Sequence, residues 1–255
     1  MKNSSILAYV LLTFVLSWSV WIPMALTGTI VHSGQSWPTH LLGLLSPAIS
    51  AIVVTTVTQK LDGVKELFSR VTKASVRPFW YLVLGFTASL IALGLFAPHS
   101  GNDYLTYSGV GSIGWLVIPY VLVVNGFGEE IGWRGFLADG LLKRFSTGVT
   151  AFIVWIIWGL WHLPLFWVVA NFIDLGLGGA IGWTIGLFTG SVLLTWMYKY
   201  SGSSIFLVAT WHTLFNFSTA TKATSGLPAA VSSTVVMVAA FALLVYPQTW
   251  RRKKA

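Results

Sequence analysis

The sequence predicts an all-α polytopic membrane protein with about eight transmembrane helices around a polar intramembrane cavity. Of its 255 residues, 55% are hydrophobic and only 9% are charged, and the mean hydropathy is +0.77. A soluble domain usually has about 25% charged residues. No stretch between the apolar segments is long enough for a separate core, so we expect residues 1–255 to form a single integral-membrane domain.

Eight apolar segments approach the length of about 20 residues that a helix needs to cross the hydrocarbon layer. They are residues 5–27, 39–59, 78–98, 113–133, 148–170, 177–198, 203–221 and 227–247. The first is longer than the roughly 7–15 apolar residues of a signal peptide, so we expect an uncleaved helix. Residues 60–77 are basic, with apolar residues at helical spacing, which predicts an amphipathic helix at the membrane interface.

The basic residues indicate an orientation for these spans. If the N-terminus is cytoplasmic, 14 of the 15 Lys and Arg residues fall in inner segments, Arg134 among them, and only Lys222 lies outside. This distribution predicts an integral protein of the cell membrane with both termini in the cytoplasm. The net charge of +8 is then explained by topology and by contact with the lipid bilayer, not by nucleic acid. The chain has no Cys, which excludes thiolate chemistry.

Two adjacent carboxylates, Glu129 and Glu130, lie in the fourth expected span. A charged side chain inside a membrane costs a few kcal/mol or more and is a functional-site candidate. Glu130 and Arg134 are four residues apart and face the same way on a helix, so we expect an ion pair. Glu129 is rotated by about 100° and points elsewhere. We therefore expect Glu130 to support the site and Glu129 to act in it, unless the three residues simply mark a helix end at the inner interface.

Four glycines accompany these charges: Gly126, Gly128, Gly132 and Gly135. Small residues let helices approach closely in membranes, which would bring side chains of other helices near Glu129.

Two histidines lie in later spans. His162 in the fifth span is a candidate general base or metal ligand, with a packed core histidine as the alternative. His212 and Asn216 in the seventh span are four residues apart and share a helix face. Together they could donate hydrogen bonds to one point, as an oxyanion hole requires, or could join helices. Counting along the spans places His162 up to about 15 Å deeper than Glu129, at 1.5 Å per residue.

These residues form an ordered set of three motifs: Glu129-Glu130-x-x-x-Arg134, Trp158-x-x-x-His162 and His212-x-x-x-Asn216. The set resembles the pattern of the CAAX protease and bacteriocin-processing (CPBP, or Abi) family, which includes the type II CAAX prenyl endopeptidases. The motif-bearing core covers about residues 113–221. Trp158 stands where the family has Phe or another aromatic residue, which keeps an aromatic wall.

The resemblance implies an intramembrane protease that cuts a membrane-associated peptide or protein substrate, near a lipidated C-terminus or within the chain. It implies catalytic roles for Glu129, His162, His212 and Asn216. We expect Glu129 to activate a water, His162 to hold that water, and His212 with Asn216 to stabilise the oxyanion.

Three other functions are consistent with the same residues. In a zinc protease, Glu129, His162 and His212 would be ligands and leave one position for water. We favour a mechanism without a cofactor, because these ligands come from three helices and Glu130 is occupied by Arg134. A non-catalytic immunity or regulatory protein could use the same polar groups to bind a partner. A proton-coupled transporter is disfavoured because the sequence lacks an internal repeat.

Overall fold

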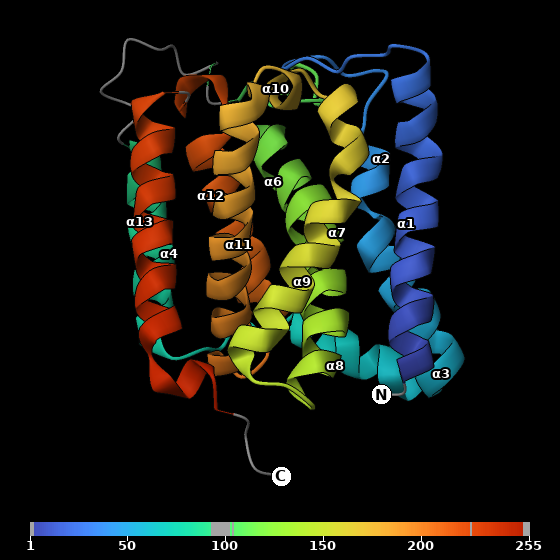
Figure 1. The fold of residues 1–255 in the computed structure, drawn as a ribbon, viewed down its shortest axis with the longest axis vertical. Helices are drawn as coiled ribbons and strands as arrows, with labels where there is room; N and C mark the ends of the chain where they lie inside the picture. The colour runs from blue at the N-terminus through green and yellow to red at the C-terminus, as the bar shows by residue number, and fades with distance from the viewer. Residues whose placement is uncertain (1–2, 93–102, 104, 225, 252–255) are drawn as a thin grey trace.

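The computed structural model describes residues 3–92, 103, 105–224 and 226–251, and within them it contains helices and no strand. The expected all-α fold is thereby confirmed. The longer helices outside the central column are α1 (Asn3–Leu26), α3 (Ser46–Val71), α4 (Pro78–Ala92), α9 (Thr147–Trp161), α11 (Gly176–Tyr200), α12 (Ile205–Thr219) and α13 (Leu227–Val245). The short helices α2 (Leu41–Leu44) and α10 (Ala170–Ile173) connect them. The long helices run side by side along one direction (Figure 1).

Among the described residues, five helices are long and apolar enough to cross a membrane. They are Asn3–Leu26, Leu41–Val71, Thr147–Trp167, Gly176–Tyr200 and Leu227–Val245. The number of eight spans stays a prediction. The expected third span is represented by α4, and its final residues, 93–98, lie outside the described part of the chain.

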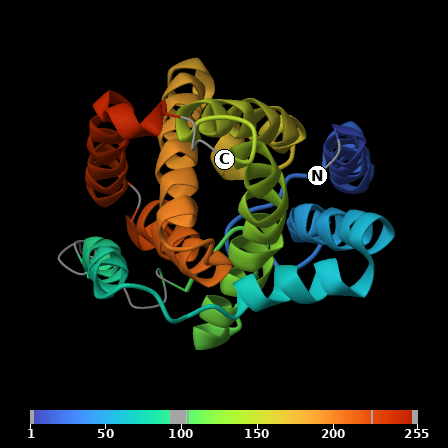
Figure 2. The same ribbon diagram turned by 90° about the horizontal axis from the view of Figure 1, so that it is seen from below.

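The chain turns inside α3. Lys60 has φ 58° and ψ −158°, so the helical path is interrupted between two helical parts. The second part lies across the lower end of the bundle, where α1 also begins (Figures 1 and 2). This is the segment for which the sequence predicts an interfacial helix. The helix ends at Val71, earlier than residue 77, and buries Leu67 against the bundle.

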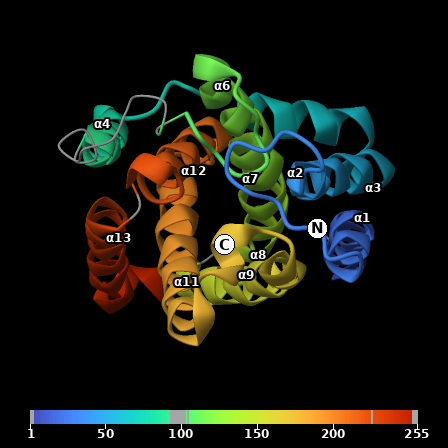
Figure 3. The ribbon, with the colours of Figure 1, turned by 90° about the horizontal axis from the view of Figure 1, so that it is seen from above.

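A central helical column carries the two glutamates. It contains η2 (Gly114–Leu116), α6 (Val117–Val121), the π-helical η3 (Leu122–Phe127), α7 (Gly128–Gly132), the π-helical η4 (Trp133–Ala138) and α8 (Asp139–Leu142). It lies between α1–α3 on one side and α11–α12 on the other (Figure 3). The glutamates thus lie between two π-helical stretches, a feature that is frequent at functional sites.

The helical column that contains the expected fourth span does not end at residue 133 but continues to Leu142. The charge distribution predicts Arg134 in an inner segment, but its side chain is completely buried within the protein. It pairs with Glu130 inside the protein, so its charge does not have to reach the membrane surface. The interpretation of Glu129, Glu130 and Arg134 as a helix end is wrong for the same reason.

The glycines of the column make the close packing that their size predicts. A Cβ atom at Gly126 would lie 2.5 Å from Thr213 Oγ1 of α12, and one at Gly132 would lie 2.4 Å from Pro47 Cβ of α3. Neither contact is sterically allowed for a larger residue without movement of the neighbour. The column therefore contacts α3 and α12 at backbone distance, which places His212 of α12 beside the glutamates.

Candidate active site

Glu130 connects two helices of the site. Its Oε1 atom lies 2.7 Å from Arg134 Nη1, in the ion pair that the four-residue spacing predicts, and 2.8 Å from His212 Nδ1. Glu130 and Arg134 are fully buried, and His212 is 6% exposed. Because an ionised carboxylate only accepts hydrogen bonds, the Nδ1 atom of His212 is the donor, and its Nε2 atom faces away from Glu130.

Glu129 contacts a different helix from Glu130, as their helical phase predicts. Its Oε2 atom accepts a hydrogen bond of 2.8 Å from the indole Nε1 of Trp158 on α9. This bond fixes one carboxylate oxygen of Glu129, and only 3% of the residue is exposed. The apolar part of the indole ring packs inside the protein while its N–H donates to the carboxylate.

Trp158 is the residue around which the site is organised. Its backbone carbonyl accepts a 2.7 Å hydrogen bond from His162 Nδ1. The centroid of its ring lies 5.7 Å from the ring centroids of His162 and of His212, and the Arg134 guanidinium carbon lies 4.5 Å from it. Trp158 therefore contacts both Glu129 and His162, although the sequence places these two residues at different depths.

A serine cap begins each of the two helices that position the histidines. The side chain of Ser146 caps α9 by accepting a bond from Val149 N, and Ser204 caps α12 by accepting one from Leu207 N. A serine at this position satisfies an amide that the helix itself leaves unpaired. His162 follows the last residue of α9, where Pro164 in the next turn ends the α-helical hydrogen bonding. His212 lies in the middle of α12 and is held by the close contact at Gly126.

Asn216 is half-buried and belongs to a second polar group at this site. Its side chain interacts with the hydroxyl of Tyr107, which also accepts a 3.4 Å hydrogen bond from Asn125 Nδ2. Tyr107 and Asn125 did not appear among the sequence candidates. Asn125 is a polar residue four positions before Glu129 in an apolar segment, a signal that could have identified it. Tyr107 lies in a loop and carries no comparable signal.

The three candidate zinc ligands do not form a ready cation site. Among the residues that the structure describes, no three His, Asp or Glu side chains are grouped so that they could hold a metal ion. The Nδ1 atoms of both histidines are engaged by protein oxygens, and Glu129 is engaged by Trp158. Bonds of this kind at Nδ1 are also made by histidines that bind a metal through Nε2, so both the metal-free and the zinc mechanism stay predictions.

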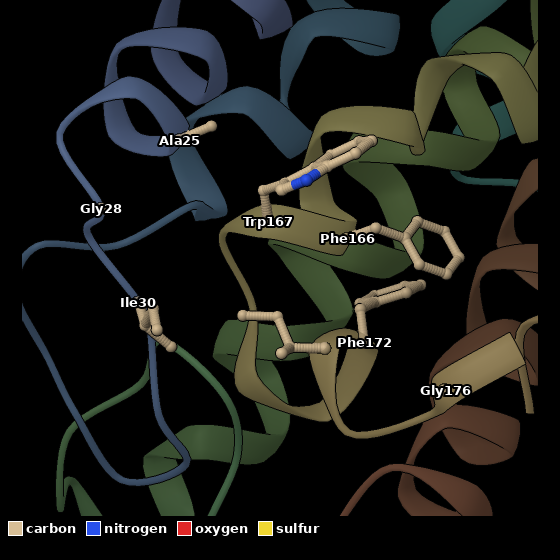
Figure 4. A pocket seen from close by; sticks show the side chains of 8 residues that line it. Ala25, Gly28, Ile30, Phe166, Trp167, Phe172 and Gly176 are labelled. Carbon is tan, nitrogen blue, oxygen red and sulfur yellow. The ribbon is translucent and has the colours of Figure 1, made fainter.

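An apolar pocket of about 520 Å³ lies near His162. Phe166 and Phe172 pack against each other in its wall, with a ring centroid distance of 4.9 Å, and Trp167 and Ile30 also line it (Figure 4). Phe172 also contacts the His162 ring, at a centroid distance of 6.2 Å. Apolar surface thus continues from the pocket to the polar site.

Comparison with known proteins agrees with this geometry. Residues 109–218 match the family model described as type II CAAX prenyl endopeptidase Rce1-like. The resemblance to this family is confirmed. Over 251 residues the chain is 25% identical to CAAX prenyl protease 2 of Methanococcus maripaludis, with 93% of this chain and 92% of that protein covered. The matched segment contains all three motifs, from Glu129 to Asn216. Together with the apolar helices, these matches support a membrane-embedded protease.

Proposed function

We propose that this protein is an intramembrane endopeptidase that hydrolyses a peptide bond near the lipidated C-terminus of a membrane-associated substrate. The observation that carries the proposal is the arrangement of Glu129, His162 and His212 around Trp158. A carboxylate and two imidazoles at one buried point can supply a base and hydrogen-bond donors to a reacting carbonyl.

Glu129 is the proposed general base. Its Oε2 atom is fixed by Trp158, which leaves Oε1 to accept the proton of a water. His162 donates from Nδ1 to a carbonyl, so its neutral ring has a lone pair at Nε2 that can accept a hydrogen bond from the same water. Two acceptors directed at one water align its oxygen for attack on the scissile carbonyl.

His212 is the proposed oxyanion donor. Its Nδ1 atom already donates to Glu130, so donation from Nε2 requires the doubly protonated imidazolium. The Glu130 carboxylate stabilises that positive charge, and Arg134 orients Glu130 through their ion pair. Asn216 is the proposed second donor, with Tyr107 positioning its amide. Glu130 and Arg134 are thus positioning residues.

The substrate proposal rests on the matched relative and on the apolar pocket. The relative is named a CAAX prenyl protease, and a prenylated peptide needs apolar surface beside the hydrolytic site. Phe172 provides continuous contact between such a pocket and His162.

The test uses purified protein in lipid nanodiscs with a fluorogenic C-terminal peptide, prenylated or unmodified. We expect the wild type to cleave the prenylated peptide and Glu129→Gln to lose cleavage while it stays folded. Asp62→Asn is the matched control, because it changes an exposed carboxylate of α3 to an amide. Full activity of Glu129→Gln would refute the base assignment.

Two rival functions give different results in the same assay. Activity that is lost with EDTA and restored by zinc would favour the metalloprotease mechanism. A wild type that cleaves neither peptide, together with a cellular phenotype that survives Glu129→Ala, would favour the non-catalytic regulatory role.

A further inference from the structure

The face of α1 that meets α3 is polar, although the rest of the helix is apolar. Ser5, Tyr9, Thr13 and Ser17 follow each other at four-residue spacing, and all are buried. Thr13 and Ser17 donate to carbonyls of their own helix. The Tyr9 hydroxyl, however, is fully buried, and beyond a weak interaction with Thr13 it has no hydrogen-bond partner among the described residues.

Other buried polar atoms without a partner come from the two elements that face Tyr9. On α3 they are the hydroxyls of Ser46 and Ser50. On the central column they are Glu130 Oε2 and the Nε and Nη2 atoms of Arg134. Tyr9 reaches this column directly, because a Cβ atom at Gly132 would lie 2.5 Å from its hydroxyl.

These six atoms have a composition that suits water. Buried polar groups are nearly always hydrogen-bonded, and ordered water is the usual partner where protein atoms are lacking. The set contains donors on Arg134, an acceptor on Glu130, and hydroxyls that can do both. An anion would suit Arg134 but would be repelled by Glu130, whereas water can bind to both.

A polar pocket of about 660 Å³ opens at the lower end of the bundle below these atoms. Ser5 of α1, Thr55 and Gln59 of α3 and Phe136 of the central column are among the residues that line it. The ring of Phe136 packs on the ring of Tyr9 at a centroid distance of 4.8 Å. The pocket wall thus continues into the group of unpaired atoms.

We propose that this polar seam between α1, α3 and the central column is a water passage from the lower pocket to the Glu130–Arg134 pair. Its occupant is water, and it supplies the hydrolytic site beside Glu129. This inference rests on the proposed function, because peptide hydrolysis consumes one water for each bond cut. The water oxygen forms the new carbon–oxygen bond as the carbon–nitrogen bond breaks, and its protons end on the carboxyl and amine products.

The test is hydroxyl-radical footprinting in nanodiscs, which labels side chains that touch water. Tyr9 and Trp21 lie on the same face of α1 and both are 0% exposed. Trp21 donates to the His40 carbonyl and lies beyond the passage, so it is the internal reference. We expect Tyr9 to be labelled at least fivefold faster than Trp21, after each rate is divided by the rate in the unfolded chain. Equal rates would overturn the passage.

Ser50→Val tests the path itself by replacing a hydroxyl with methyl groups. We expect it to reduce Tyr9 labelling severalfold and to lower the cleavage rate, with little change in KM. The matched control is Ser232→Val, since Ser232 is also a fully buried serine for which the described part of the chain offers no partner, but it lies on α13. Unchanged Tyr9 labelling in folded Ser50→Val would contradict the proposal. If that variant does not fold, the comparison of Tyr9 with Trp21 in the wild type decides.

The footprinting and cleavage assays test separate proposals, so one proposal can be refuted while the other stands. A wild type that labels at Tyr9 but cleaves no peptide would refute the proposed function and leave the passage. A wild type that cleaves but does not label at Tyr9 would refute the passage alone.

Discussion

The central column carries two groups of charges that differ in their surroundings. One is the buried group of Glu130, Arg134 and His212, in which the ion pair is fully buried. The other lies at the lower end, where Asp139 contacts Arg70 at 3.0 Å and Lys143 at 2.8 Å. There the side chain of Arg70 is 16% exposed and that of Lys143 is 60% exposed.

The contrast separates a functional cluster from a structural one. Solvent-exposed ion pairs contribute about 0–1 kcal/mol, a range that suits the Lys143 contact, whereas the more buried Arg70–Asp139 contact fastens α3 to α8. Burying charges costs several kcal/mol for each ion, and the attraction between partners often only compensates for it. A protein that keeps the buried group has a use for it, which we attribute to its connection with Glu129 and His212.

The largest loss of stability is expected from Arg134→Met. This change leaves Glu130 buried without its cation, which typically costs about 3–5 kcal/mol. Thermal unfolding in detergent should show a large drop in the transition temperature. Replacing both partners, in Glu130→Gln with Arg134→Met, should recover part of the loss. A single variant as stable as the wild type would show that the pair is not essential to the buried cluster.

A large loss of activity with a smaller loss of stability is expected from His212→Gln. Removing one donor from an oxyanion site typically lowers kcat by about 10²–10³-fold. The measurement is kcat and KM for the prenylated reporter peptide. A rise in KM with an unchanged kcat would contradict the oxyanion role and would indicate a role in substrate binding.

An intermediate effect is expected from Trp158→Phe. This variant keeps an aromatic ring but removes the indole donor to Glu129, and leaving a buried acceptor unpaired costs about 1–3 kcal/mol. We expect cleavage to fall about tenfold or more. Trp155→Phe is the control, since Trp155 of α9 donates to the backbone carbonyl of Thr184 on α11. If both variants had equal activity, the hydrogen bond from Trp158 to Glu129 would not contribute to cleavage.

The smallest effect is expected at the lower group of charges. Asp139→Asn should lower the free energy of unfolding by less than Arg134→Met does, and less at high salt, because Asp139 and its two cations keep some contact with solvent. Cleavage per folded molecule should stay at the wild-type rate. If Asp139→Asn lowered the free energy of unfolding as much as Arg134→Met does, the buried and the lower groups of charges would not differ in their contribution to stability.

Local spacing was sufficient to predict part of this structure. The ion pair of Glu130 with Arg134 and the separate direction of Glu129 follow from helical phase alone. The apolar segments predicted the helices and their order. These features depend on residues within one turn or one span, for which the periodicity of the sequence carries the information.

Local spacing does not predict contacts between segments that are far apart in the sequence. The bond from Trp158 to Glu129 joins two helices, and the position of Tyr107 beside Asn216 depends on how a loop returns to α12. The helix end was predicted incorrectly because Arg134 resembles a residue at the membrane surface. Only tertiary packing shows that its charge is neutralised internally.

The central claim is that the two adjacent glutamates have different roles, and one paired measurement tests it most directly. Cleavage rate and unfolding temperature are measured for Glu129→Gln and Glu130→Gln in the same nanodisc preparation. We predict that Glu129→Gln loses at least about 10²-fold in cleavage, a typical contribution of a general base, with a near-normal unfolding temperature. Glu130→Gln should lower the unfolding temperature more. Wild-type cleavage by folded Glu129→Gln would contradict the account.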